Sequence, residues 1–313
     1  MTSVDNNDLF EQYYQKEYDF NTVSLSKNEI SVIKKLVREK RVDYALAPIG
    51  TGIFGWIYKQ SQNIQFELLE FDSDRIDGML YIPTTGKEKA YIVLNSNKPL
   101  VNQIFTAAHE FYHYICDYQK FKEKPYICDF GDLKDVNEKK ACRFAAELLL
   151  PEEALKREVE DFCRFVEVKN LDKAEFSDAA AFIIALTLKY QMPLKAVIYR
   201  LLEEEYINDI NRYISSYDFI KRVLLEIKVS ENLVNELYSN KNAYVIPYGN
   251  IYQNMERAYV SGNASREEVL KDAEELGLDM SLINEFLSKD TYDDPDDSED
   301  DEELFALIRS RQE

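Results

Sequence analysis

Residues Gln103–Tyr118 read QIFTAAHEFYHYICDY, and this stretch decides how the central part of the chain folds. It contains both histidines of the chain, His109 and His113, with Glu110 directly after the first. On a helix, residues four apart lie on one face, so both imidazoles can reach one metal ion. Glu110 projects about 100° away from His109, where it can touch a metal-activated water without being a ligand. The spacing therefore predicts a metal-binding helix, and we expect one Zn²⁺ per chain.

The same stretch is apolar on most of its sides. Ile104, Ala107 and Phe111 form one apolar stripe, and Phe105 lies on the opposite side with the histidines. A helix that is apolar nearly all round is a central, buried one. The alternative is a pair of core histidines without a metal, but such a pair needs hydrogen-bond partners and gains nothing from an adjacent glutamate.

Three β-rich runs come directly before this helix, at Ile64–Phe71, Gly78–Ile82 and Ala90–Leu94. Polar turns separate them, which is typical of consecutive strands. Glycine and proline are scarce in the rest of the chain, where helical patterns prevail. We therefore predict an α+β fold, in which a small, mostly antiparallel sheet packs on the zinc-binding helix and a predominantly helical C-terminal region follows.

The chain divides into five predicted parts. They are an N-terminal helical segment at 1–40, a zincin-like metallopeptidase core at 41–170, a helix pair at 171–207, a helical acidic region at 208–289, and an acidic tail at 290–313. Ser26 is expected to cap a helix through Arg38, and Asp135 or Asn137 to cap one that ends at Leu149. Nine of the eleven residues from Asp293 to Glu303 are acidic, so we expect the tail to be disordered.

Composition excludes several classes of function. The net charge of −20 disfavours nucleic acid and anionic membranes and favours basic partners. Direct DNA binding through the helix pair is also disfavoured, because Leu194–Ile207 carries three glutamates beside Lys195 and Arg200. No apolar run is long enough to span a bilayer, and the N-terminal residues lack the pattern of a signal peptide. The four cysteines show no C-x-x-C spacing, so we expect reduced thiols and a cytoplasmic location.

A catalytic zinc site needs a third protein ligand. No histidine remains, and Glu138 lies 25 residues beyond His113 at the start of the next predicted helix. Its helical face continues with small and apolar residues, so it is expected to be buried. The alternatives are that Glu138 is an exposed residue favoured by the helix dipole, or that Cys116 or Cys142 is the ligand.

QIFTAAHEFYHYI, followed by EKKACRFAAELLLP at Glu138–Pro151, resembles the ImmA/IrrE family of intracellular zinc metallopeptidases over about residues 40–207. The resemblance implies that His109, His113 and Glu138 bind the metal and that Glu110 is the catalytic base. There are two departures, because the family usually has glycine where this chain has Tyr112 and asparagine where it has Cys142.

The resemblance implies a zinc-dependent endopeptidase of the cytoplasm. Its substrate would be a basic, DNA-binding transcriptional repressor, cleaved at one site to switch on stress-response or mobile-element genes. The alternative is a metal-containing regulatory protein that binds a transcriptional regulator with little or no hydrolysis. Glu110 argues against this alternative, because a protein that only binds has no need of the base.

Overall fold

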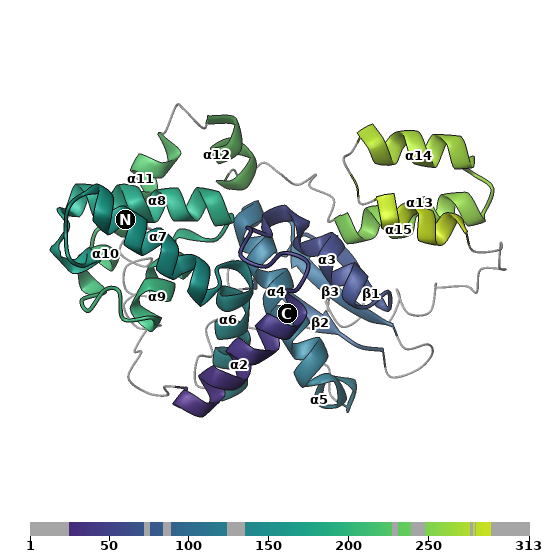
Figure 1. Cartoon of the computed structure of the whole chain (residues 1–313). Coiled ribbons are helices and arrows are strands. Elements are labelled where there is room, and N and C mark those ends of the chain that lie inside the picture. The colour runs from purple at the N-terminus through teal and green to yellow at the C-terminus, as the bar shows by residue number, and fades with distance from the viewer. Residues whose placement is uncertain are drawn as a thin grey trace, which may run out of the picture.

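The computed structural model confirms an α+β fold, in which a small sheet and its helix lie between two groups of helices (Figure 1). The description covers residues 25–71, 76–83, 89–123, 135–226, 231–238, 248–275, 278 and 280–288. The predicted N-terminal helix before residue 25, Cys128 and the acidic tail from 290 lie outside these residues.

The sheet of the described residues has three strands: β1 (Ile64–Leu69), β2 (Gly78–Tyr81) and β3 (Ala90–Asn95). Their order is β1-β3-β2. β2 and β3 are antiparallel, but β1 and β3 are parallel over six residue pairs, so the prediction of a mostly antiparallel sheet is wrong. β2 lies on the side of β3 opposite to β1. β3 then fits between them and runs in the same direction as β1. Every residue of β3 is buried, as befits the central strand.

Helix α4 (Leu100–Cys116) follows β3 and packs on one face of the sheet. Leu80 and Ile92 share a core cluster with Ile104 and Ala107 of this helix. The approach is close at Gly78, where a Cβ atom would stand 2.6 Å from Cγ2 of Thr106. The predicted buried helix is confirmed, and it begins three residues earlier than Gln103.

In the described part of the chain, the α-helices α2 (Lys27–Lys40) and α3 (Ile53–Gln60) precede the sheet. Ser26 caps α2 as predicted, and Glu29 completes a capping box by accepting hydrogen bonds from the Ser26 backbone N–H and hydroxyl. Glu29 also forms an ion pair with Lys140 at 3.0 Å, so the first turn of α2 lies against α6 (Val136–Leu149). A short helix, α5 (Tyr118–Glu123), comes between α4 and α6 in the sequence.

The next helices include the predicted helix that ends at Leu149 and the predicted pair within 171–207, whose second helix ends at Glu203, four residues before Ile207. They are α6 (Val136–Leu149), α7 (Glu152–Phe165), α8 (Phe176–Tyr190) and α9 (Leu194–Glu203). Asp135 caps α6 by accepting a hydrogen bond from the backbone N–H of Asn137. None of the described helices is long and apolar enough to cross a membrane alone; α8 and α9 reach that length only together, across a bend of 110°.

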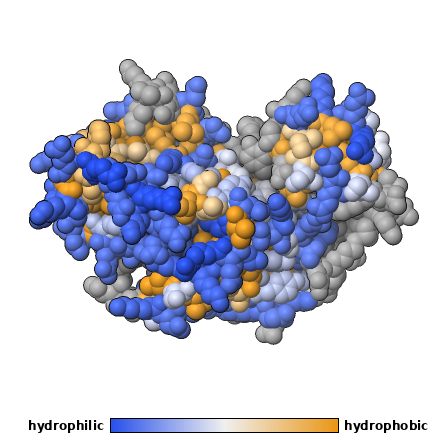
Figure 2. Space-filling model, viewed as in Figure 1, coloured by the Kyte–Doolittle hydropathy of each residue, from blue (hydrophilic) through white to orange (hydrophobic). Residues whose placement is uncertain are grey.

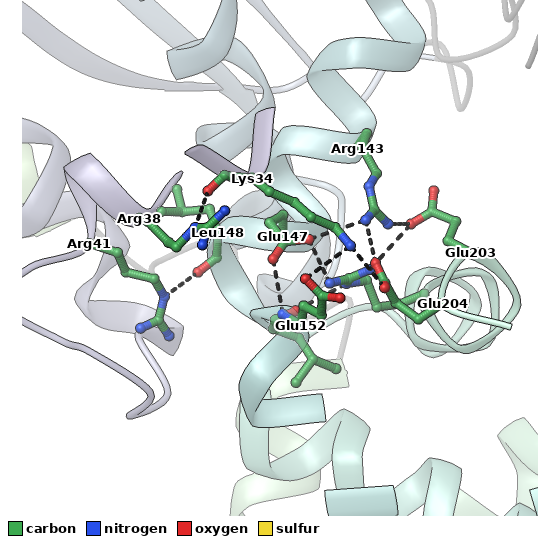
Figure 3. Close-up of polar contacts among 11 residues, drawn as sticks. Lys34, Arg38, Arg41, Arg143, Glu147, Leu148, Glu152, Glu203 and Glu204 are labelled. Atoms are coloured by element: carbon green, nitrogen blue, oxygen red, sulfur yellow. Dashed lines mark hydrogen bonds and ion pairs between the residues drawn. The ribbon is translucent and has the colours of Figure 1, made fainter. Parts of the chain in front are cut away.

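A buried network of charged side chains joins α2, α6 and α9 (Figure 3). Arg200 of α9 donates to Glu147 of α6 at 2.6 Å and to the carbonyl of Leu150 at 3.0 Å. Arg143 of α6 pairs with the same Glu147 and with Glu204 beyond α9. These contacts fix the C-terminal half of α6, and they thereby help to orient the N-terminal end of the same helix.

The described residues after α9 are mostly helical, as predicted. Their helices are α10 (Asn211–Ile214), α11 (Tyr217–Leu225), α12 (Glu231–Tyr238), α13 (Tyr248–Val260), α14 (Arg266–Glu275) and α15 (Met280–Leu287). Tyr252 of α13 stacks on Tyr58 of α3, with ring centres 5.8 Å apart. These two residues form a second apolar cluster with residues of α14 and α15. Figure 2 shows hydrophobic surface over α13–α15 and on the side of α8 and α11, amid mostly hydrophilic surface.

Candidate metal centre

Helix α4 presents both histidines to one point. Their side chains are 0% and 1% exposed, and the Nε2 atoms of His109 and His113 lie 3.2 Å apart. Two ring nitrogens at that distance repel each other through their lone pairs, unless one of them carries a proton or a cation lies close to both. The i,i+4 spacing thus produces the convergence that the sequence predicts.

Helix α6 brings Glu138 to the same point. One carboxylate oxygen lies 3.1 Å from His109 Nε2, and the other lies 3.3 Å from His113 Nε2. Glu138 is 3% exposed, so the alternative of a solvent-exposed first-turn glutamate is wrong. One ligand atom from each of the three residues lies within 4.8 Å of the others, and this group could hold a metal ion.

The electrostatics of the group suit a cation. Burial lowers the pKa of His109 to about 4, against the effect of its hydrogen bond with Glu138. Burial also opposes the charge on His113, but hydrogen bonds with Asp117 and Glu138 outweigh it and raise the pKa of His113 to about 9. Burial disfavours the Glu138 carboxylate, yet the two histidines hold its pKa well below the usual range. Two nitrogen donors and one charged carboxylate, gathered away from solvent, fit a metal ion such as zinc.

Glu110 lies on α4 directly after the first histidine and is completely buried. It is not a member of the three-residue group. Its negative charge contributes to the raised pKa of His113, which indicates that the carboxylate is near that imidazole. This position, beside the centre but outside the ligand group, is the one predicted for a base.

Cys116 and Cys142, which were considered as alternative third ligands, do not lie where a metal ligand would. Cys142 Sγ lies 3.5 Å from His109 Nδ1, on the nitrogen that faces away from Glu138. Burial raises the pKa of this thiol, so it stays neutral. Cys116 is exposed, and neither cysteine belongs to the group. The three cysteines that the structure describes, Cys116, Cys142 and Cys163, form no disulfide with one another.

Asp117 was not predicted as a site residue, and its carboxylate accepts a hydrogen bond from His113 Nδ1 at 2.8 Å. The signal was present, because Asp117 follows His113 by four residues on the same helix. Tyr112, the other departure from the family pattern, packs on Phe144 of α6 with ring centres 5.4 Å apart. Its ring also meets the edge of the His113 ring, so Tyr112 fills the α4–α6 interface.

Two histidines of an H-E-x-x-H helix, joined by a glutamate from a second helix, define a centre of the metallopeptidase type. Residues 59–202 match the Peptidase_M78 family model, described as the IrrE N-terminal-like domain. The match includes all four predicted site residues, and the domain belongs to the ImmA/IrrE family. It spans parts of the predicted core and helix pair, whose boundaries stay predictions. No curated protein matches the chain.

Proposed function

We propose that the chain is a zinc-dependent endopeptidase. The observation that carries the proposal is the convergence of His109, His113 and Glu138 on one buried point inside a domain of a peptidase family. Both imidazoles turn Nε2 to this point, and both carboxylate oxygens of Glu138 face it. Two histidines and one carboxylate are a donor set of catalytic zinc sites.

The roles of the chain's own residues follow from this geometry. His109, His113 and Glu138 would hold a zinc ion, which would supply Lewis-acid chemistry by lowering the pKa of water to about 7 and polarising the scissile carbonyl. Glu110 accepts the proton of the attacking water and returns it to the leaving amine. The helical backbone fixes Glu110 relative to both histidines, and its burial keeps competing solvent away from the carboxylate.

The proposed substrate is a basic, DNA-binding regulatory protein of the cytoplasm. The net charge of −20 supports this choice, because an acidic surface attracts a basic partner and speeds their association. β2 forms one edge of the sheet and packs against α4. All four residues of β2 are buried, so a peptide could add to this edge through main-chain hydrogen bonds, beside the helix that carries Glu110, only if neighbouring residues move.

A second candidate is a regulatory binding protein that keeps the metal centre but hydrolyses little. The burial of the centre favours it, since His109, Glu110 and His113 are at most 1% exposed. A peptide bond reaches these side chains only if neighbouring residues move. The two candidates differ in one outcome, because a binding protein associates with its partner without shortening it.

Cells that make the wild-type chain should contain one newly truncated regulatory protein, which stays intact in cells that make the Glu110→Gln variant. The check is mass spectrometry of protein N- and C-termini in the two cultures, followed by cleavage of the purified candidate. A partner that co-purifies with both chains at full length would favour the binding protein instead. If the two cultures share every new terminus, peptidase activity is contradicted.

A further inference from the structure

The outer nitrogens of the two imidazoles have different partners. His113 Nδ1 is 2.8 Å from a carboxylate oxygen of Asp117, and His109 Nδ1 is 3.5 Å from the sulfur of Cys142. Both contacts lie on the side of each ring opposite to Nε2, which faces Glu138. Each imidazole therefore has a contact at Nδ1 as well as one at Nε2.

The partner of Nδ1 decides which ring nitrogen is available to a metal. A neutral imidazole has one N–H, and only the other nitrogen has a lone pair to give. An acceptor at Nδ1 keeps the proton there and leaves Nε2 free to coordinate. A carboxylate does this strongly, because the hydrogen bond is charge-assisted, whereas a neutral thiol sulfur is a weak acceptor.

We propose that Asp117 and Cys142 are positioning residues of the metal centre, and that Cys142 is the weaker of the two. The inference rests on the proposed metal centre and adds the residues that orient its histidines. His109 is then the less firmly held ligand, and a better acceptor at position 142 should tighten metal binding.

The elements that carry these residues are suited to the role. Asp117 ends α4 as its C-cap, and its backbone N–H bonds to the carbonyl of His113, so both ends of this contact share one turn. Cys142 follows Glu138 by four residues on α6, so one face of this helix meets His109 both at Nε2 and at Nδ1. A shift of α6 along its axis would disturb both contacts together.

The test is the Zn²⁺ dissociation constant, measured by competition with a chromophoric chelator, for the full chain and four variants. Asp117→Ala should weaken binding about 10–100-fold, because no acceptor remains at His113. Asp117→Asn keeps an oxygen at this place and should lose less. Cys142→Ala should weaken binding by a smaller factor than Asp117→Ala. Cys142→Asn, which offers an amide oxygen at similar volume, should bind Zn²⁺ more tightly than wild type.

Cys163→Ala is the matched control, since it removes a thiol that lies on α7, and it should leave the dissociation constant unchanged. Thermal melting of each zinc-free variant shows whether it is folded. Wild-type affinity in Asp117→Ala, or Cys142→Asn binding no more tightly than Cys142→Ala, would overturn the inference. A wild-type chain that binds no Zn²⁺ at all would instead refute the proposed metal centre itself.

Discussion

Glu110→Gln is expected to slow peptide cleavage by about 10²–10⁴-fold, the usual effect of removing a general base. Glutamine has nearly the shape of glutamate but cannot accept a proton from water. Glu110 lies outside the group of His109, His113 and Glu138, so the variant should keep its fold and its metal. The measurement combines the cleavage rate of a verified substrate, the zinc content and the melting temperature.

Glu153→Gln is a suitable control for this variant. It makes the same chemical change at an exposed position in the first turn of α7 and should retain the wild-type rate. If Glu110→Gln cleaves as fast as the wild type, Glu110 is not the base. If it loses its zinc, Glu110 belongs to the ligands and the assignment of Glu138 has to be revised.

Arg200→Met is expected to lower the free energy of unfolding by about 3–5 kcal/mol, the cost of breaking a buried ion pair on one side. The guanidinium of Arg200 is completely buried and donates to Glu147, Glu204 and the Leu150 carbonyl. Methionine keeps much of the length of the side chain but donates no hydrogen bond. Glu147 then keeps its charge in a buried place, with Arg143 as its remaining arginine partner.

Urea unfolding of the zinc-free protein measures this effect. Arg157→Met, at an exposed position on α7, is the control and should change the unfolding free energy by less than about 0.5 kcal/mol. Adding Glu147→Gln to Arg200→Met should recover part of the loss, because the two residues interact directly. A loss below about 1 kcal/mol in Arg200→Met would mean that the network does not hold α6 in place.

The candidate site was largely predictable because its signals are local. His109, Glu110 and His113 lie within five residues, and helical geometry alone brings the two imidazoles together. Glu138 needed a further argument, since it belongs to another helix. The sequence indicated that Glu138 is buried, because Ala141, Ala145 and Leu148 continue its face of α6. The structure places its carboxylate beside the two histidines.

Pairings between distant segments could not be predicted in the same way. Polar turns between the strand runs suggested that consecutive strands pair, but β1 pairs with β3 and leaves β2 on the far side. The glutamates at the end of α9 argued against direct DNA binding, but the sequence did not indicate that Glu204 meets buried arginines from α6 and α9. In both cases the partner is far away in sequence, and only the tertiary fold decides which groups meet.

The metal content of the purified protein shows whether His109, His113 and Glu138 form one metal site. Elemental analysis of the wild type should find about one zinc per chain, the occupancy of a site with three protein ligands. His113→Ala removes one of two converging nitrogens and should lose nearly all of this zinc after dialysis, while Cys163→Ala keeps it. Zinc content in His113→Ala equal to that of the wild type would contradict the account.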